Sequence, residues 1–292
     1  MDDLDKKSAI TEKKLYEVKP LEELTLMDDY MFSAVMRNKA NLKPLLECIL
    51  NVTIKEIEFI EAQKTEKNGY RSKGIRLDLY VKDTDEQIYN VEVQTSSKRN
   101  LPKRMRYYQS VIDINILEPG VDYNKLMKSY VIFICGYDPF GMERYRYTFG
   151  NRCLEVDNLP LGDETVKIIV NTKGTDGDIS AELKNVLLYL DYGITSSEYT
   201  RQLDDAVRTV KCSEERRHEY MVMMIHEMEV REEGREEGRE EGREEGREEG
   251  RILVLNSLVK DGVLTLTDAA KRVNMTPAEF QGKAKSAQNN HH

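Results

Sequence analysis

The chain has 292 residues and a net charge of −9, from 53 Asp and Glu against 44 Lys and Arg. No apolar run comes near the roughly 18 residues of a membrane-spanning helix, and the opening residues, MDDLDKKSAI, lack the apolar stretch of a secretion signal. The four cysteines form no CxxC pair, and all except Cys212 sit among apolar residues. These features argue against a membrane or disulfide-stabilised secreted protein. They predict a cytoplasmic protein in which Cys48, Cys135 and Cys153 are buried and no cysteine is catalytic.

Most of the negative charge comes from one low-complexity tract. Five copies of Arg-Glu-Glu-Gly occupy residues 231–250 and carry −5, which leaves −4 for the rest of the chain. A Glu such as Glu232 can pair with the Arg three residues later for about 0.2–0.5 kcal/mol, whereas each Gly costs a helix about 1 kcal/mol against Ala. The tract has no apolar residue with which to pack. We therefore predict a solvated spacer that is only conditionally helical.

The N-terminal part predicts a polar arm followed by helices. Residues 1–20 are polar and poor in aromatics, which is typical of a flexible arm. Thr25 precedes Asp28 and Asp29, an arrangement that caps a helix start. Hydrophobic periodicity then predicts helices at residues 24–38 and 42–50 and a strand at 54–62. The polar residues 64–73 predict a loop.

Two alternating segments around an acidic turn predict a β-hairpin. Residues 75–81 (IRLDLYV) and 87–94 (QIYNVEVQ) alternate apolar and polar side chains, and Asp, Thr and Glu between them supply turn chemistry. Because side chains at i and i+2 of a strand share a face, Glu92 and Gln94 should point the same way. The turn position places Asp78 close to opposite Glu92 across the ladder. Two carboxylates and an amide would then meet in one place.

This set of side chains predicts a divalent-metal site for phosphodiester hydrolysis. Mg²⁺ takes near-octahedral oxygen ligands, usually one or two carboxylates with water and phosphate oxygens. Asp78 and Glu92 can supply such ligands to Mg²⁺, or to Mn²⁺ in its place, and Gln94 can orient the attacking water. Half-buried sheets also carry Asp and Glu on their solvated faces, so the hairpin alone leaves a purely structural interpretation open.

The downstream segments complete a mixed sheet. A long helix is predicted at residues 96–116 and a buried strand at 130–135, with further strands at 145–149 and 166–170. The order of two helices, a strand, a hairpin, a helix and a strand is typical of an α/β (α+β mixed sheet) fold with helices on the faces of the sheet.

Basic residues lie on both sides of the acidic pair in the sequence. Arg104 and Tyr108 are four residues apart and share a helix face, and Arg104 or Arg106 is placed to contact the scissile phosphate. Such charges would line a groove that follows a DNA backbone, because phosphate contacts give sequence-independent affinity. The candidate DNA-binding residues are Arg76, Lys98, Arg99, Lys103, Arg104 and Arg106. Ordinary solvation of these charges is the alternative interpretation.

The C-terminal third is predicted to be helical. Helices are expected at residues 181–192 and 197–230, the second ending in a cluster of methionines. Beyond the spacer, helix signals at 252–260, 268–274 and from Thr276 predict a three-helix tail that resembles a helix-turn-helix. A tail of about 40 residues is small for an unaided core. We therefore expect self-association through the region from about residue 221 onward.

Several of these motifs resemble the PD-(D/E)xK nuclease superfamily, in which an Asp is followed by an acidic residue and, two positions later, a Lys. Here Gln94 takes the place of the Lys. The Glu-x-Gln variant is similar to that of the Rpn branch, recombination-promoting nucleases also labelled transposases. Three flanking segments add to the likeness, namely LTLMDDYMFSAVM at 24–36, RMRYY at 104–108 and YVIFI at 130–134. The resemblance covers roughly residues 21–190.

The resemblance implies a restriction-endonuclease-like core and a small all-α C-terminal tail. It implies Mg²⁺-dependent DNA cleavage of low sequence specificity, with roles in recombination or in defence against mobile DNA. The superfamily often places another acid near the metal, which favours Asp29 over Asp28 and leaves Glu47 as a weaker alternative. It also suggests that the tail is made alone from an internal start. The expected divisions are the arm, the nuclease core, a helical connector, the spacer and the helical tail, at residues 1–20, 21–195, 196–230, 231–250 and 251–285.

Two other classes of function remain open from the sequence. The chain could be a catalytically silent DNA-binding or assembly protein that keeps the nuclease fold, because the amide of Gln94 cannot carry the charge of a Lys. It could instead be a regulatory oligomer in which the C-terminal part is the functional element. A divalent-dependent DNA cleavage assay separates both from the nuclease.

Overall fold

The computed structural model describes residues 19–66, 75–97, 100–117 and 120–290, without the side chains at 59, 62–66, 75–78 and 288–290. The chain divides into two compact units, Met1–Tyr220 and Met221–His292. Most of the predicted arm and of the predicted polar loop falls outside the described residues, as do Lys98 and Arg99. Within the described ranges, no helix combines the length and the apolar content that crossing a bilayer requires.

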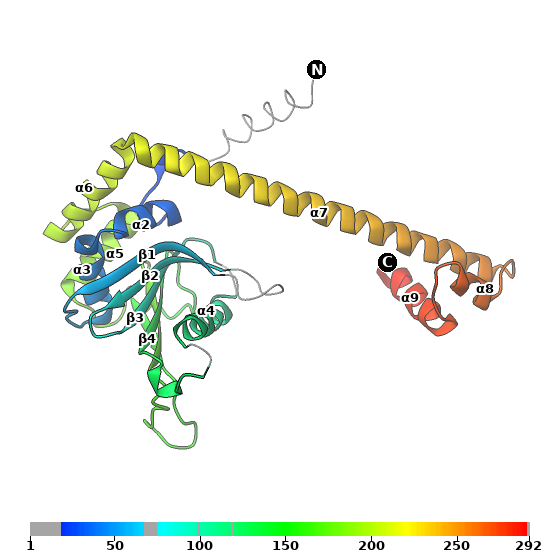
Figure 1. Ribbon diagram of the computed structural model, residues 1–292, viewed down its shortest axis with the longest axis horizontal. Helices are drawn as coiled ribbons and strands as arrows, with labels where there is room; N and C mark the ends of the chain where they lie inside the picture. Colours follow the sequence, from blue (N-terminus) through cyan, green and yellow to red (C-terminus); the bar gives the residue numbers. More distant parts are fainter. Residues whose placement is uncertain (1–18, 67–74, 98–99, 118–119, 291–292) are drawn as a thin grey trace. The chain divides into compact units, whose positions relative to one another are not determined.

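A mixed sheet forms the centre of the first unit (Figure 1). Its described strands lie in the order β1-β2-β3-β4-β6-β5. The pairs β1–β2, β2–β3 and β5–β6 are antiparallel, whereas β3–β4 and β4–β6 are parallel. This arrangement confirms the predicted α/β fold class. The strands are β1 (Ile57–Glu66), β2 (Ile75–Asp83), β3 (Ile88–Gln94), β4 (Ser129–Cys135), β5 (Arg146–Phe149) and β6 (Thr165–Asn171).

The predicted hairpin is the β2–β3 pair, and Asp83 shapes its turn. The Asp83 Oδ1 accepts hydrogen bonds from the backbone N–H groups of Asp85 at 3.0 Å and Gln87 at 2.8 Å. Its Oδ2 accepts one from the Tyr89 hydroxyl at 2.7 Å. Glu86 takes a positive φ of 61° in the tight turn. Asp83 is thus a structural carboxylate, because its oxygens bind the turn that sets the register of the two strands.

Helices cover both faces of this sheet. Figure 1 shows α4 (Leu101–Ile116) on one side, with α2 (Asp29–Met36) and α3 (Lys39–Leu50) on the other. The α4 side is held by a buried cluster that includes Met105 and Ile112 of the helix and Phe133 of β4. Burial of such large apolar side chains, each stabilising the fold by roughly 1.5–3 kcal/mol, fixes α4 over β3 and β4.

Several helix boundaries differ from the sequence predictions, in each case because a local polar group or proline decides the start. The first helix begins at Asp29 rather than at residue 24, because Asp28 accepts the backbone N–H of Thr25 at 2.6 Å and holds the preceding segment in a turn. The helix predicted from residue 96 begins at Leu101, where Pro102 occupies its first turn. The helix predicted at 197–230 is two helices, because the chain breaks at Ser213.

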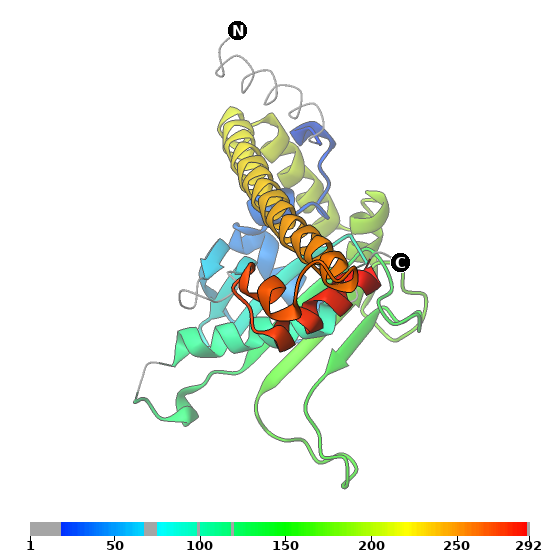
Figure 2. The ribbon, with the colours of Figure 1, turned by 90° about the vertical axis from the view of Figure 1, so that its right-hand side faces the viewer.

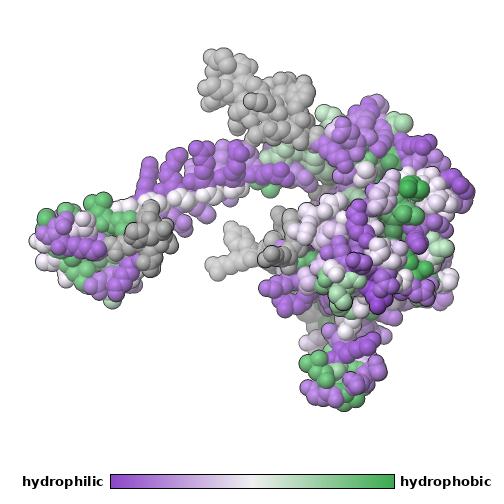
Figure 3. Space-filling view, turned by 180° about the vertical axis from the view of Figure 1, so that it is seen from behind, coloured by the Kyte–Doolittle hydropathy of each residue, from purple (hydrophilic) through white to green (hydrophobic). Residues whose placement is uncertain are grey.

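The connection between β5 and β6 projects from the sheet as a long hairpin (Figure 2). Leu154 is 94% exposed and Leu161 is 69% exposed, and green apolar residues are visible at this projecting end in Figure 3. The connection also carries Glu155 and Asp157. It is therefore an exposed apolar segment with acidic neighbours.

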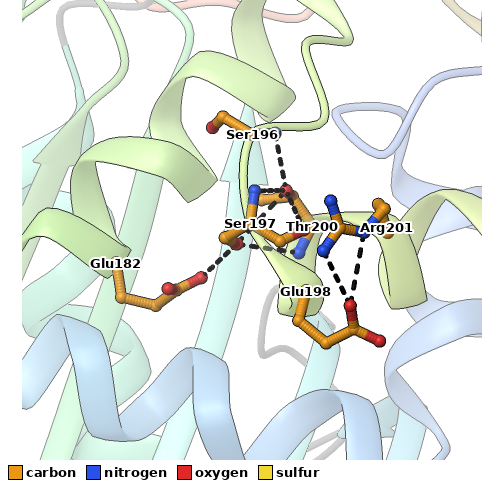
Figure 4. Close-up of polar contacts among 6 residues, drawn as sticks. All are labelled: Glu182, Ser196, Ser197, Glu198, Thr200 and Arg201. Carbon is orange, nitrogen blue, oxygen red and sulfur yellow. Dashed lines mark hydrogen bonds and ion pairs between the residues drawn. The ribbon is translucent and has the colours of Figure 1, made fainter.

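A polar cluster joins the starts of α5 (Ala181–Tyr192) and α6 (Glu198–Cys212), as Figure 4 shows. The Ser197 hydroxyl donates to the Glu182 carboxylate at 2.5 Å and accepts the backbone N–H of Thr200 at 3.2 Å. The Thr200 hydroxyl in turn accepts the backbone N–H of Ser197 at 2.9 Å, which completes a capping box. These contacts fix the angle at which the chain enters α6.

The Arg-Glu-Glu-Gly tract lies inside one continuous helix, α7 (Glu214–Lys260), which has 47 residues. A Cβ built on any of its five glycines would meet nothing within 4 Å, so a side chain at these positions would enter open space. The expectation of a marginal helix concerned the tract in isolation. In the chain, the turns on either side carry apolar residues that pack, and a helix that is already nucleated extends at little further cost.

The C-terminal three-helix unit, residues 251–290, has a core of its own. The end of α7 packs with α8 (Leu266–Lys271) and α9 (Pro277–Asn290), which Figure 2 shows as orange and red helices. Its buried side chains are Ile252, Leu255, Ala269, Ala270, Phe280 and Ala284. The view that this tail is too small to bury its apolar residues is therefore wrong for Ile252 and Leu255. It holds for Val263, which is 67% exposed.

Candidate active site

Polar side chains line one face of β3 beneath α4. Asn90, Glu92 and Gln94 alternate along the strand, and each pairs with a residue of β4 that belongs to the buried cluster under α4. Asn90 is 0% exposed and Glu92 is 2% exposed, whereas Gln94 at the strand end is half-buried. The prediction that Glu92 and Gln94 share a face agrees with this alternation. Asn90 is a third polar member of the same row.

Asp78 lies on β2, one residue before the stretch that pairs with β3. Leu79 pairs with Val91, and Tyr80 pairs with Asn90. Continuing this antiparallel register by one residue puts Asp78 opposite Glu92. The side chains of Asp78 and Arg76 lie outside the described part of the structure. The structure therefore places Asp78 and Arg76 by their backbone positions on β2.

The Glu92 carboxylate is buried among polar groups. Asn90 donates its amide N–H to the Glu92 Oε1 at 3.2 Å, and the Arg104 guanidinium lies 3.9 Å from the Oε2. The Asn90 Oδ1 is buried and has no hydrogen-bond partner within the described part of the chain. A buried polar oxygen without a partner costs about 1–3 kcal/mol, so this oxygen is a candidate ligand or acceptor at a functional site.

Arg104 links the helix to the end of β3. It donates to the Gln94 Oε1 through a short hydrogen bond and to the Tyr108 hydroxyl at 3.1 Å. Its guanidinium carbon lies 5.2 Å from the centre of the Phe133 ring, a distance typical of a cation–π contact. The Gln94 amide N–H groups are directed to Ser96, whose carbonyl and hydroxyl oxygens are each 2.9 Å away. Gln94 therefore orients Arg104 in this structure.

The remaining basic candidates on α4 have a different setting. Lys103 and Arg106 are exposed, whereas Arg104 is half-buried and turned toward the sheet. Lys98 and Arg99 are outside the described residues. The exposed pair suits contacts to a polyanion in solvent. Arg104 suits contact with a group that enters the site itself, because a half-buried guanidinium has stronger electrostatic interactions.

The two further acidic candidates occupy structural positions. Asp29 is exposed at the first residue of α2, where a negative charge favours the helix N-terminus. Glu47 accepts the backbone N–H of Ile54 at 2.9 Å through its Oε1, which lies 3.8 Å from the Lys43 ammonium. The Glu47 carboxylate therefore closes the connection between α3 and β1. Neither observation places these carboxylates beside Glu92.

The cysteines differ partly from expectation. Cys135 is buried, Cys48 and Cys153 are partly exposed, and Cys212 is exposed. Burial raises the pKa of the Cys135 thiol to about 12. At neutral pH this thiol is protonated, and it is a poor nucleophile because the thiolate is the reactive form.

The donor atoms around Glu92 fit a hard divalent cation. Mg²⁺ prefers carboxylate and amide oxygens, and the site offers the Glu92 carboxylate and the unpartnered Asn90 Oδ1. No cluster of three or more His, Cys, Asp or Glu suited to a metal occurs among the described side chains, a set that does not include Asp78. Sequence reasoning missed Asn90. Its position two residues before Glu92 was the available signal, because it shares the Glu92 face.

A family model matches the part of the chain that carries this site. Residues 26–155 match the model described as PD-(D/E)XK nuclease family transposase. The match spans α2, α3, β1 to β5 and α4, and so contains Glu92, Gln94 and Arg104. Searches of curated proteins and of solved structures found no significant match. The resemblance inferred from the sequence is confirmed at this level: residues 26–155 are similar to the PD-(D/E)XK nuclease family transposases.

Proposed function

We propose that the protein is a Mg²⁺-dependent DNA endonuclease that hydrolyses phosphodiester bonds with low sequence specificity, with Mn²⁺ as an alternative ion. The observation that carries the proposal is the buried Glu92 carboxylate beside the Asn90 Oδ1, which has no hydrogen-bond partner among the described side chains, in a region that matches the nuclease family model. A buried amide oxygen without a partner costs stability, and a bound ion next to the Glu92 carboxylate would use this oxygen.

Each side chain of the site has a distinct proposed role. Glu92 and Asp78 hold the divalent ion, with the Asn90 Oδ1 as a further oxygen donor. When bound, the ion neutralises charge on the phosphate and acidifies a coordinated water. Arg104 contacts the scissile phosphate and supplies the positive charge that a Lys at position 94 would otherwise provide. Gln94 orients Arg104 through the short hydrogen bond, in addition to its predicted role toward water.

Contacts outside the site would provide affinity for any DNA sequence. Lys103 and Arg106 are exposed on α4, close in sequence to Arg104. Arg76, Lys98 and Arg99 complete the proposed set from the sequence alone. Phosphate contacts carry no base information, so a surface of this kind implies low specificity. Such an activity suits cytoplasmic recombination or defence against mobile DNA, which we include in the proposal.

Arg104 also supports a second candidate function. Its guanidinium already lies 3.9 Å from the Glu92 carboxylate, and Gln94 holds it there. A fixed cation in this position partly offsets the charge that would attract a metal ion. A catalytically silent DNA-binding or assembly protein that retains the fold would have such an arrangement. The two candidates differ in whether cleavage occurs when Mg²⁺ is supplied.

We further propose self-association through the helical region from Met221 onward, with a short form made from an internal start such as Met221. Val222 and Val230 of α7 are each 53% exposed, and Val254 is 62% exposed. Association would cover these side chains. Ile252 and Leu255, at the end of α7, are already buried in the three-helix unit. We therefore expect the exposed side chains of α7 to form the contact.

A plasmid-nicking assay tests the enzyme proposal. Purified full-length protein is incubated with supercoiled plasmid and Mg²⁺ or Mn²⁺, beside samples with EDTA and beside the Asp78→Ala and Glu92→Gln variants. Nicking should require the ion and both carboxylates. Protein that binds the plasmid but never nicks it would instead support the silent DNA-binding candidate.

A further inference from the structure

The C-terminal three-helix unit has the order of elements of a helix-turn-helix, two helices joined by a short turn. The segments α8 and α9 are joined by residues 272–276, in which Asn274 adopts a positive φ of 52°. The left-handed conformation lets the chain turn sharply after α8, as a Gly does in many such turns. Phe280 of α9 is fully buried against Ile252 and Leu255 of α7. The third helix is therefore fixed on the first by a packed core.

The start of α9 is well defined by its own capping box. The Thr276 hydroxyl accepts the backbone N–H of Glu279 at 3.3 Å, and the Glu279 Oε2 accepts the backbone N–H of Thr276 at 2.8 Å. The bond from that backbone N–H keeps the pKa of the Glu279 carboxyl below its usual value. The one acidic side chain among the described residues of α9 is thus engaged in its own cap.

One face of α9 is buried, and the opposite face is exposed and carries small residues in its first two turns. Phe280, Ala284 and Ala287 are buried. Ala278, Gly282 and Lys285 are exposed on the opposite side, at spacings of four and three residues. A Cβ on Gly282 would meet nothing within 4 Å. Small residues in the first turns let a helix approach a groove closely, and the exposed side chains Gln281, Lys285 and Ser286 stand beside them.

The three-helix unit and the Arg-Glu-Glu-Gly tract before it carry opposite net charges. Residues 251–290 contain six Lys and Arg against three Asp and Glu, a net charge of +3. The adjacent tract at 231–250 has five Arg against ten Glu, a net charge of −5. A polyanion would be repelled by the tract and attracted to the three-helix unit. Among macromolecular partners, this charge favours a nucleic acid over a basic protein.

We propose that the C-terminal three-helix unit binds duplex DNA by inserting α9 into the major groove. Gln281, Lys285 and Ser286 present the donors and acceptors that read base edges, because Gln pairs well with adenine, Lys with guanine and Ser with either. The function is independent of cleavage and of the candidate active site on β3.

A matched pair of lysines provides the test. Lys283 and Lys285 are both exposed on α9, but the Lys283 ammonium is 2.7 Å from the Glu248 carboxylate of α7, away from the open face. Binding of a fluorescent duplex is measured by anisotropy with full-length protein and EDTA, so that cleavage cannot occur. Lys285→Ala should weaken binding about tenfold, whereas Lys283→Ala should stay within about twofold.

A bulky substitution on the exposed face of α9 separates a loss of DNA binding from a loss of folding. Gly282→Leu places a side chain in open space, so it should stabilise the helix against heat while it weakens DNA binding. A purely structural role for α9 would not separate these two measurements. Unchanged binding in Lys285→Ala and Gly282→Leu, or equal losses in the Lys283→Ala control, would overturn the proposal.

Two further outcomes are distinguishable. A change of molecular mass in light scattering on Lys285→Ala, with DNA affinity intact, would show that the open face of α9 joins copies of the chain and would overturn DNA binding there. If the endonuclease proposal failed, plasmid nicking would be absent, but Lys285→Ala would still weaken duplex binding in the anisotropy assay.

Discussion

The molecule contains two Glu–Arg pairs of opposite character. The Arg235 and Glu232 pair on α7 is closer, at 2.9 Å, with side chains 68% and 33% exposed. The Arg104 and Glu92 pair beneath α4 is wider, at 3.9 Å, with side chains 28% and 3% exposed. Burial rather than distance decides their consequences. The solvated pair contributes at most about 1 kcal/mol, whereas a buried charge that loses its partner is strongly destabilising.

Glu and Arg thus have different effects in the two regions. Along α7, repeated Glu and Arg keep a helix soluble and set its net charge. Beneath α4, one Glu and one Arg are held by Asn90, Gln94 and Tyr108, so their positions are fixed by the fold. Fixed charges in a water-poor site are the arrangement that stabilises a developing charge in catalysis.

The largest expected effect is loss of the metal ligands. Asp78→Ala and Glu92→Gln should each lower divalent-dependent nicking by about a thousandfold, because ligand loss removes several kcal/mol of charge stabilisation. Initial rates on supercoiled plasmid measure the effect, and circular dichroism checks that the variants fold. Nicking by Glu92→Gln at the wild-type rate would assign the buried carboxylate to the fold alone.

Arg104 should affect both stability and activity. Arg104→Ala leaves Glu92 with less compensation, and we expect it to lower the free energy of unfolding by about 1–3 kcal/mol and the nicking rate by about a hundredfold. Urea unfolding and plasmid nicking measure the two quantities. The control is Arg106→Ala, which removes an exposed charge on the same helix. If the control lost as much activity at equal affinity, Arg104 would have no special role.

Gln94 should tolerate one substitution and not another. Gln94→Lys should retain or raise the nicking rate, because an ammonium restores a charge next to Glu92. Gln94→Ala should lower the rate by about tenfold, because Arg104 loses one of its hydrogen-bond acceptors, the Gln94 Oε1. Rates at saturating DNA separate this effect from binding. A Gln94→Ala protein as fast as wild type would remove the position from the site.

The exposed charges of α4 should act on DNA affinity alone. Replacing Lys103 and Arg106 by Ala should weaken binding to all duplexes by a similar factor. It should also flatten the dependence of log affinity on log salt by about one unit for each lost contact. Anisotropy titrations at several salt concentrations provide the slope. An unchanged slope would identify both residues as ordinary solvated charges.

The smallest effect is expected in the tract. Gly238→Ala and Gly242→Ala should each stabilise α7 by about 1 kcal/mol, since both positions are open and Gly is a poor helix former. Arg235→Ala should change stability by less than about 0.5 kcal/mol, in contrast to Arg104→Ala. Amide hydrogen exchange along α7 measures both. A large loss on Arg235→Ala would mean that the tract is in contact with another surface.

The sequence determined much of this protein by itself. Period-two alternation located β2 and β3 and the shared face of Glu92 and Gln94, because local hydrophobic patterns record which side of a strand is buried. The residues that carry the family resemblance were also readable without coordinates. Helix α5 was predicted with its observed bounds, 181–192, and in the structure Ser180 caps its start and Gly193 follows its end.

Only the tertiary structure decided the rest. The burial of Asn90, the inward turn of Arg104 and the use of Glu47 in closing a loop depend on partners far away in the chain, which no local pattern contains. The continuity of α7 and the packed core of the three-helix unit could not be read from local propensity. Propensity measures an isolated segment, whereas packing at a few turns can nucleate a helix and bury a small core that the segment alone could not maintain.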